Sequence, residues 1–177
     1  MVDWREQLRV DPLPGLLAGA DAALGYFVRR DLVGQDAGPA EDVWRLPALQ
    51  RLLRKQRSDG AWSRPGAQKH AAINHALIET WRQFRVLVEQ YGCTRDHPPT
   101  RRAAEFLFAC QTPAGDIRGI LANQYTTYYT GAIMALLIQA GYADDPRIER
   151  ALADVASRSA LLVVLGSFPA ATHPDAP

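Results

Sequence analysis

The chain of 177 residues has few cysteines, and its N-terminus shows no targeting signal. Cys93 and Cys110 are its two cysteines, and they form no Cys-x-x-Cys pair. The first ten residues, MVDWREQLRV, contain acids and lack an apolar core, so they match neither a signal peptide nor a membrane anchor. We therefore expect a reducing, cytoplasmic compartment, with both thiols as small buried hydrophobes.

Strong net charge and long apolar runs are also absent. The formal net charge of +1 gives no reason to expect binding to nucleic acid, to an anionic membrane or to an acidic substrate. The most apolar stretch near the end, ALLVVLGSF, is too short to span a bilayer as a helix, so no transmembrane segment is predicted. The remaining composition, 47% apolar and 22% charged, is typical of a globular domain.

Helical periodicity dominates what is present, and no strand pattern or hairpin signal competes with it before Ala160. Gly92 is expected to cap a helix, Pro98 and Pro99 to mark a break, and Asp145 with Pro146 to start the last helix. The helix beginning near residue 127 contains no charged residue, so no face of it is clearly meant for water. The pattern predicts helices over about 16–32, 46–56, 71–91, 100–111 and 127–140, and from 146 onward.

Two segments repeat within the chain. LRKQRSDGAWSRPG, residues 53–66, and LFACQTPAGDIRGI, residues 107–120, each combine the end of a helix, a glutamine and a glycine-containing loop. Gln56 precedes Gly60 by four residues, as Gln111 precedes Gly115, and the two copies lie 55 residues apart. Such a period indicates a stacked helical array in which neighbouring units share a core.

The segment QRSDGAW matches the Gln-x-x-x-Gly-x-Trp pattern of the squalene-cyclase and prenyltransferase repeat, so residues 43–152 resemble that family. In the family, each repeat supplies an outer helix, the Gln–Trp loop and an inner helix that lines a central cavity. The resemblance implies an all-α fold, a partial α/α toroid of about three antiparallel helix pairs, or half of an α6/α6 barrel. The second copy is imperfect, since Ile117 stands where Trp62 stands in the first. The motif residues are expected to be structural: Gln56, Gly60, Trp62, Gln111 and Gly115.

The catalytic residues of the family are not matched. Its proton-donating acid lies in an Asp-x-Asp-Asp-Thr stretch, and the corresponding residues here, Thr126 to Thr130, include no aspartate. Its zinc ligands lie near inner-helix starts, where neither Cys93 nor Cys110 is expected. We therefore predict no metal and no cofactor, and whether the chain is an enzyme stays open.

Several residues are candidates for ligand contact because they are expected at the loop ends of inner helices, where the family's cavity opens. Tyr128 and Tyr129 could contact a ligand or belong to a buried core. Asp116 and Arg118 could orient a polar ligand or pair with each other within their loop. The full candidate set is Asn74, His75, Asp116, Arg118, Tyr125, Tyr128 and Tyr129.

The repeat pattern is lost near the end of the sequence. We divide the chain into a repeat domain, residues 1–152, and an irregular tail, residues 153–177, where no third Gln–Trp loop follows. Two explanations are open: the reading frame shifts after about Leu152 and a second half is missing, or the chain covers its open edge by forming a homodimer.

Two functions follow from these patterns. The leading hypothesis is a terpenoid-cyclase-like fragment with an apolar cavity for an isoprenoid-type ligand, not catalytically complete by itself. The alternative is a non-catalytic helical scaffold that acts through protein contacts.

Overall fold

The computed structural model describes residues 7–63 and 73–165. In these ranges the regular elements are all helices, so the predicted all-α class is confirmed. Among the described residues, no helix has both the length and the apolar character needed to cross a membrane.

The first half of the chain forms shorter helices than the periodicity predicts. The expected helix over 16–32 is interrupted at Ala20, whose ψ of 134° is extended, because Asp21 starts a new helix by accepting a hydrogen bond from the Leu24 amide at 2.9 Å. The next expected helix begins at Pro47, a first-turn proline, close to its expected start, and ends at Leu53 rather than at residue 56. The elements are α1 (Leu13–Gly19), α2 (Ala22–Phe27) continuing as the π-helix η2 (Val28–Val33), α3 (Ala40–Trp44) and α4 (Pro47–Leu53).

The second half follows the predictions more closely. Gly92 has a φ of 58° and ends the third predicted helix, as expected. Pro98 and Pro99 lie in the first turn of a helix rather than in a break, because proline needs no amide hydrogen bond there. The elements are α5 (His75–Arg85) with η3 (Val86–Gln90), α6 (Pro98–Ala109), α7 (Thr127–Leu137) with η4 (Ile138–Tyr142) and α8 (Pro146–Leu165).

Helix α8 passes the predicted domain boundary. It begins at Pro146, where the Asp145 side chain accepts a hydrogen bond from the Arg147 amide at 2.9 Å, and it continues beyond Leu152 to Leu165. Residues 166–177 of the predicted tail lie outside the described residues. The division of the chain at residue 152 therefore stays a prediction.

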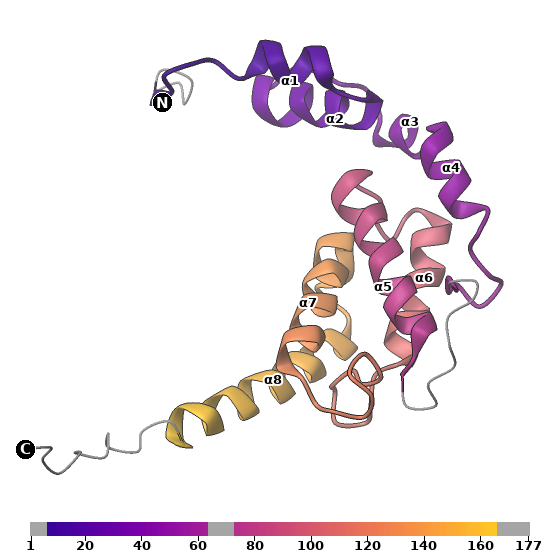
Figure 1. Cartoon of the computed structure of the whole chain (residues 1–177), viewed down its shortest axis with the longest axis vertical. Helices are drawn as coiled ribbons and strands as arrows, with labels where there is room; N and C mark the ends of the chain where they lie inside the picture. The colour runs from indigo at the N-terminus through magenta and orange to yellow at the C-terminus, as the bar shows by residue number, and fades with distance from the viewer. Residues whose placement is uncertain (1–6, 64–72, 166–177) are drawn as a thin grey trace, which may run out of the picture.

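The helices follow one another along an arc with a hollow side (Figure 1). Helices α1 and α2 lie at one end of the arc and α8 at the other, while α7 faces the hollow side and α6 lies on the opposite side of α5. Helix α5 packs against α6, and α7 packs against α8.

Two apolar clusters stabilise this arrangement. The larger one joins α5 to α8 and includes Leu49 and Trp62 from the preceding segment. The smaller one has three buried residues, Ala23, Tyr26 and Val43, and lies among the N-terminal helices. Trp44 and Tyr91 contact both clusters. Fully buried large side chains of the main cluster include Leu77, Phe84, Leu107, Ile133, Met134 and Leu137.

Candidate functional site

The two predicted loops make the same hydrogen bonds. Gln56 Nε2 donates to the carbonyl of Gly60 at 3.0 Å and to that of Pro99 at 2.8 Å. Gln111 Nε2 donates to the carbonyl of Gly115 at 2.8 Å and to that of Arg147 at 2.9 Å. Each side-chain amide thus closes its own loop and joins that loop to the first turn of a later helix, α6 or α8. The equivalence expected from spacing is present in the structure.

A further pair of contacts ties each loop to the helix that follows it. The amide of Trp62 donates to Thr80 Oγ1 and the amide of Ile117 donates to Thr130 Oγ1, both at 3.0 Å. Both threonines are fully buried, on α5 and α7. Their anchoring role was not predicted, and the available signal was an isolated hydroxyl on an otherwise apolar helix face. Trp62 also donates its Nε1–H to the Leu52 carbonyl at 3.1 Å, a bond that the isoleucine of the second loop cannot make.

The two loop glycines permit close backbone packing. Gly60 and Gly115 have φ values of 85° and 111°, in the left-handed region that favours glycine. A Cβ atom at Gly115 would lie 2.6 Å from the Arg150 carbonyl oxygen, and one at Gly60 would collide with the Arg102 carbonyl oxygen. Glycine is required because each loop lies directly against the backbone of the next outer helix.

The candidates Asp116 and Arg118 pair with each other. Arg118 Nε donates to Asp116 Oδ2 at 2.6 Å, and the Thr112 hydroxyl also donates to this fully buried carboxylate. Burial alone would raise the pKa of Asp116, but the hydrogen bonds from Arg118 and Thr112 outweigh it and lower the pKa below its usual value. The geometry favours the loop-anchoring role over ligand orientation.

The candidates Asn74 and His75 lie at the start of α5. Asn74 Oδ1 accepts a hydrogen bond from the Leu77 amide at 3.0 Å, so it caps the helix. The backbone N–H of Asn74 donates to the Gly119 carbonyl at 2.7 Å and joins this helix start to the second Gln loop. His75 is half-buried, and its Nε2 atom has no hydrogen-bond partner within the described part of the chain.

Tyr125 lies beneath a charged pair from α8. The Arg158 guanidinium is 4.0 Å from the centre of the Tyr125 ring, and Arg158 Nε donates to Asp154 Oδ1 at 2.9 Å. Burial and the nearby Asp154 carboxylate raise the pKa of Tyr125 to about 12. This phenol therefore stays neutral at physiological pH.

The remaining two tyrosines have different surroundings. Tyr129 is half-buried and packs edge-on against Trp81, with ring centres 5.5 Å apart. Tyr128 is 71% exposed and contacts Tyr129 at 5.2 Å between ring centres. Of the pair, Tyr128 is the residue available to a ligand, and Tyr129 belongs to the edge of the core.

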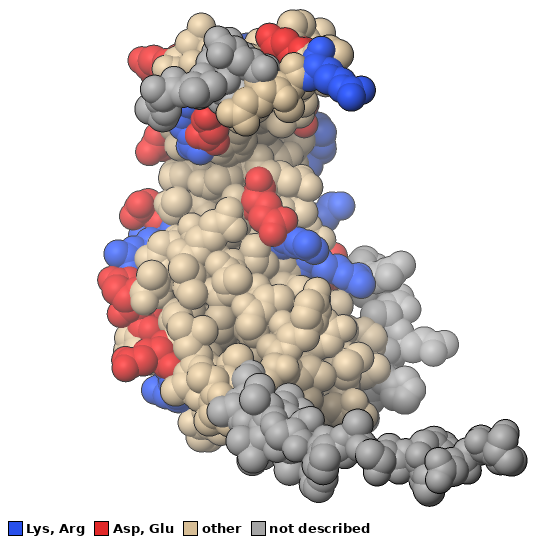
Figure 2. Space-filling view, turned by 90° about the vertical axis from the view of Figure 1, so that its left-hand side faces the viewer, with Lys and Arg blue, Asp and Glu red and all other residues tan. Residues whose placement is uncertain are grey.

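Tyr128 begins an uncharged face of α7 and η4 that we call the α7 stripe. The opposite face of this helix contributes Ile133, Met134 and Leu137 to the core. Figure 2 views the molecule from its hollow side, and uncharged residues cover the broad lower part of that face, with charged residues mostly at its margins. The α7 stripe consists of Tyr128, Gly131, Ala132, Ala135, Ile138 and Gln139, all exposed or half-buried.

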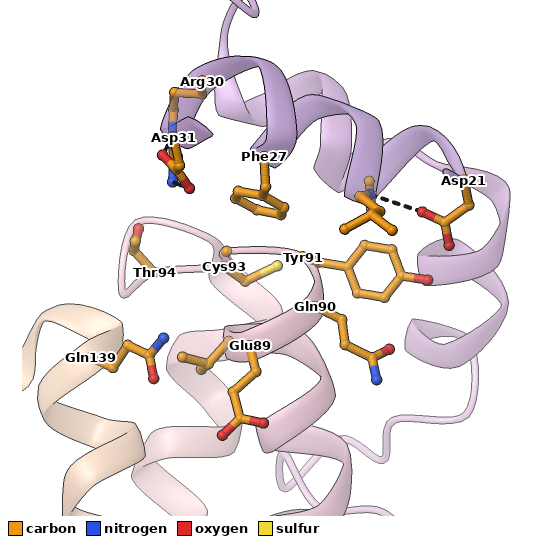
Figure 3. A pocket seen from close by; sticks show the side chains of 14 residues that line it. Asp21, Phe27, Arg30, Asp31, Glu89, Gln90, Tyr91, Cys93, Thr94 and Gln139 are labelled. Carbon is orange, nitrogen blue, oxygen red and sulfur yellow. Dashed lines mark hydrogen bonds and ion pairs between the residues drawn. The ribbon is translucent and has the colours of Figure 1, made fainter. Parts of the chain in front are cut away.

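A surface hollow of about 630 Å³ adjoins one end of the α7 stripe. Side chains from α2 and η2 form one wall, and those of η3, the turn after it and Gln139 form the other (Figure 3). No sequence pattern predicted it, because its lining comes from segments far apart in the chain. Among the lining residues are Leu24, Phe27, Arg30, Asp31, Glu89, Gln90, Tyr91, Cys93, Thr94 and Gln139.

Cys93 is the buried small hydrophobe that was predicted, whereas Cys110 is only half-buried. Cys93 is 1% exposed, and burial raises its pKa to about 12. Burial likewise raises the pKa of Cys110 to about 11, so both thiols are protonated at neutral pH. Within residues 7–63 and 73–165, no group of three or more His, Cys, Asp or Glu residues is arranged to hold a metal ion.

The two Gln loops share their glutamine, their glycine and the hydrogen bond between them, while Ile117 of the second loop replaces Trp62 of the first. Comparison with protein-family models, curated protein sequences and solved structures found no match to this chain.

Proposed function

We propose that this chain is part of an α/α toroid of the squalene-cyclase type and that its inner helices bind an isoprenoid-like apolar ligand. The order of elements supports the proposal: outer α4, Gln loop, inner α5, outer α6, Gln loop, inner α7. The inner helix α7 lies toward the hollow side of the arc (Figure 1). In the resembled family, that is the side on which the ligand cavity forms.

The α7 stripe is the observation that carries the proposal. It presents tyrosine, isoleucine and small side chains to solvent, and it includes no charge over more than two helical turns. Fully covering a large apolar side chain is worth about 1.5–3 kcal/mol, so a ligand that covers Tyr128 and Ile138 gains binding free energy. A contiguous uncharged surface of this kind is typical of a binding site.

Binding without cyclisation is the activity that the residues support. Protonating an alkene requires a strong acid, and the start of α7 offers only hydroxyl groups from Thr126 to Thr130. Tyr125, with a pKa of about 12, is a weaker acid still. We therefore assign the chain a binding role in which no group transfers a proton to the ligand.

A protein-contact scaffold is the second candidate. It is favoured by apolar side chains that are exposed away from the α7 stripe, notably Leu152 on α8, which is 46% exposed. A partner protein would cover both surfaces, whereas a small ligand would cover the stripe alone.

A charge placed within the α7 stripe tests the proposal. Ala135→Asp introduces a carboxylate at an exposed position in the stripe, and Ala153→Asp introduces the same group at an exposed position on α8 as the matched control. With farnesol and geranylgeraniol as probes, we expect Ala135→Asp to raise the dissociation constant at least about tenfold and Ala153→Asp to leave it unchanged. Melting temperatures without ligand should match between the two variants. Failure of every isoprenoid to stabilise the wild-type chain, together with a stable hetero-complex, would favour the scaffold.

A further inference from the structure

The hollow and the α7 stripe meet at one residue. Gln139 lines the hollow and is also the last residue of the stripe, next to the exposed Ile138. A ligand bound in the hollow can therefore extend along α7 without crossing a charged side chain of that helix. From Ile138 to Tyr128 the helix is about 15 Å long, because each of its residues rises 1.5 Å. A dodecyl chain spans a similar length.

The walls of the hollow suit a polar head group joined to an apolar chain. Leu24, 45% exposed, and the half-buried Phe27 supply apolar surface from α2. Gln90 and Gln139 supply exposed side-chain amides, and Thr94 supplies a hydroxyl. Figure 3 shows Phe27 on one side of the hollow and the glutamines on the other.

The charges around the hollow select against an anion. Its lining includes three carboxylates, on Asp21, Asp31 and Glu89, and one guanidinium, on Arg30. Arg30 already forms a two-point pair with Asp31, with Nε–Oδ1 at 2.6 Å and Nη2–Oδ2 at 2.9 Å. Glu89 pairs with Arg85 at 3.0 Å. Two of the three carboxylates are therefore compensated by arginines, and the uncompensated negative charge is that of Asp21, whose Oδ1 accepts a hydrogen bond from the Leu24 amide. A phosphate or carboxylate head group would meet excess negative charge, whereas an ammonium group would be attracted.

We propose that the hollow and the α7 stripe together bind a long-chain amine, with the ammonium group in the hollow and the chain along α7. The inference rests on the proposed function for the chain-binding stripe and adds the chemical class of the head group. It excludes prenyl diphosphates as ligands of this surface.

Three probes with the same dodecyl chain and different head groups test the inference: dodecylamine, dodecanol and dodecanoate. Each is titrated below its micelle concentration at pH 7 and low salt, with binding followed by calorimetry and by the melting temperature. We expect dodecylamine to bind at least about tenfold more tightly than dodecanoate, with dodecanol between them, and to raise the melting temperature. Equal affinities for the three probes, or a melting temperature lowered by the amine, would overturn the inference.

Two variants locate the head group. Glu89→Gln should weaken dodecylamine several-fold and leave dodecanol unchanged, while Glu149→Gln, an exposed glutamate on α8, should change neither. Asp31→Asn releases Arg30 from its pair, so dodecanoate should bind more tightly to this variant than to the wild type. Unchanged head-group preference in both variants would contradict the assignment.

Failure of this inference differs from failure of the proposed function. If Ala135→Asp abolishes binding of all three probes and the hollow variants change nothing, the stripe stands and the head-group site is wrong. If dodecylamine responds to the hollow variants and not to Ala135→Asp, the head-group site stands and the stripe is wrong. If neither the dodecyl probes nor the isoprenoids bind, both proposals are wrong.

Discussion

His97 illustrates at the residue scale how surroundings decide the charge of a side chain. The residue is 7% exposed, its Nδ1 atom lies 2.8 Å from the Thr100 hydroxyl, and its ring centre is 5.1 Å from that of Trp44. Burial lowers the pKa of His97 to about 4, and the positive charge of Arg102 acts in the same direction. His97 is therefore neutral in the folded protein at pH 7.

The buried histidine predicts a loss of stability in mild acid. Between pH 6.5 and about 4 the unfolded chain binds a proton at His97 that the folded chain does not bind, so the free energy of unfolding falls as the pH is lowered. We expect a loss on the order of 2 kcal/mol over this range. Urea denaturation at about pH 7.0, 5.5 and 4.5 measures this loss, because these pH values lie on both sides of the ordinary histidine pKa.

The variant His97→Gln serves as the control, since it keeps a polar side chain near Thr100 and cannot titrate. Its stability should depend less on pH over the same range. Asp116, whose pKa is lowered, contributes in a separate window: its stabilisation is present above its ordinary pKa of 3.8 and is lost only as the pH falls below that value. Parallel pH profiles for the wild type and His97→Gln would contradict the assignment to His97.

At the scale of elements, the two Gln loops predict similar effects of equivalent substitutions, with the difference that Gln56 Oε1 also accepts a hydrogen bond from the exposed side chain of Arg102. Gln56→Ala and Gln111→Ala each remove a donor to two backbone carbonyls, so each should lower the free energy of unfolding by about 1–3 kcal/mol. The double variant should show the sum, because the loops share no partner. Gln124→Ala, at an exposed loop position, is the control and should have little effect in the same urea titrations. A large effect at one glutamine and none at the other would contradict structural equivalence.

The helices show what periodicity can and cannot predict. The apolar spacing identified the helical class and the last four helices because it extends over several turns. The break at Asp21 was missed because it depends on one residue, a side-chain cap, within a pattern that continues across it. This cap divides the first predicted helix, whereas the second, expected over 46–56, is the single helix α4, which ends at Leu53.

The Gln loops and the hollow show how much of the candidate site the sequence could predict. Gln56 and Gly60 have the same four-residue spacing as Gln111 and Gly115, so the equivalence of the two loops was predictable from the sequence. Asp116 with Arg118 was left open between two roles, because pairing depends on burial that the sequence does not give. The hollow joins Phe27 to Gln139, and only the assembled fold brings such distant residues together.

For the molecule as a whole, the two apolar clusters imply unequal local stability. Among the described residues, the smaller cluster has three buried members, against more than twenty in the main one. Its attachment to α5 and η3 relies on the shared residues Trp44 and Tyr91 and on Phe27, whose ring lies against Gly92. Local opening requires less free energy where fewer apolar contacts are lost.

We therefore expect α1, α2 and η2 to open before α6 and α7. Amide hydrogen exchange should show a lower opening free energy in the N-terminal helices, and Phe27→Ala should accelerate exchange there and leave α6 and α7 unchanged, because it removes a wall of the hollow without touching the main core. The thiol of Cys93, which lines the hollow, reports the same opening: in a Cys110→Ser background, its labelling by a thiol reagent should be faster in Phe27→Ala than in the parent. Leu17→Ala, an exposed position on α1, should change neither rate. Exchange at one uniform free energy across all helices would instead mean that the molecule opens as a single unit, and the hollow would then form and disappear only with the whole fold.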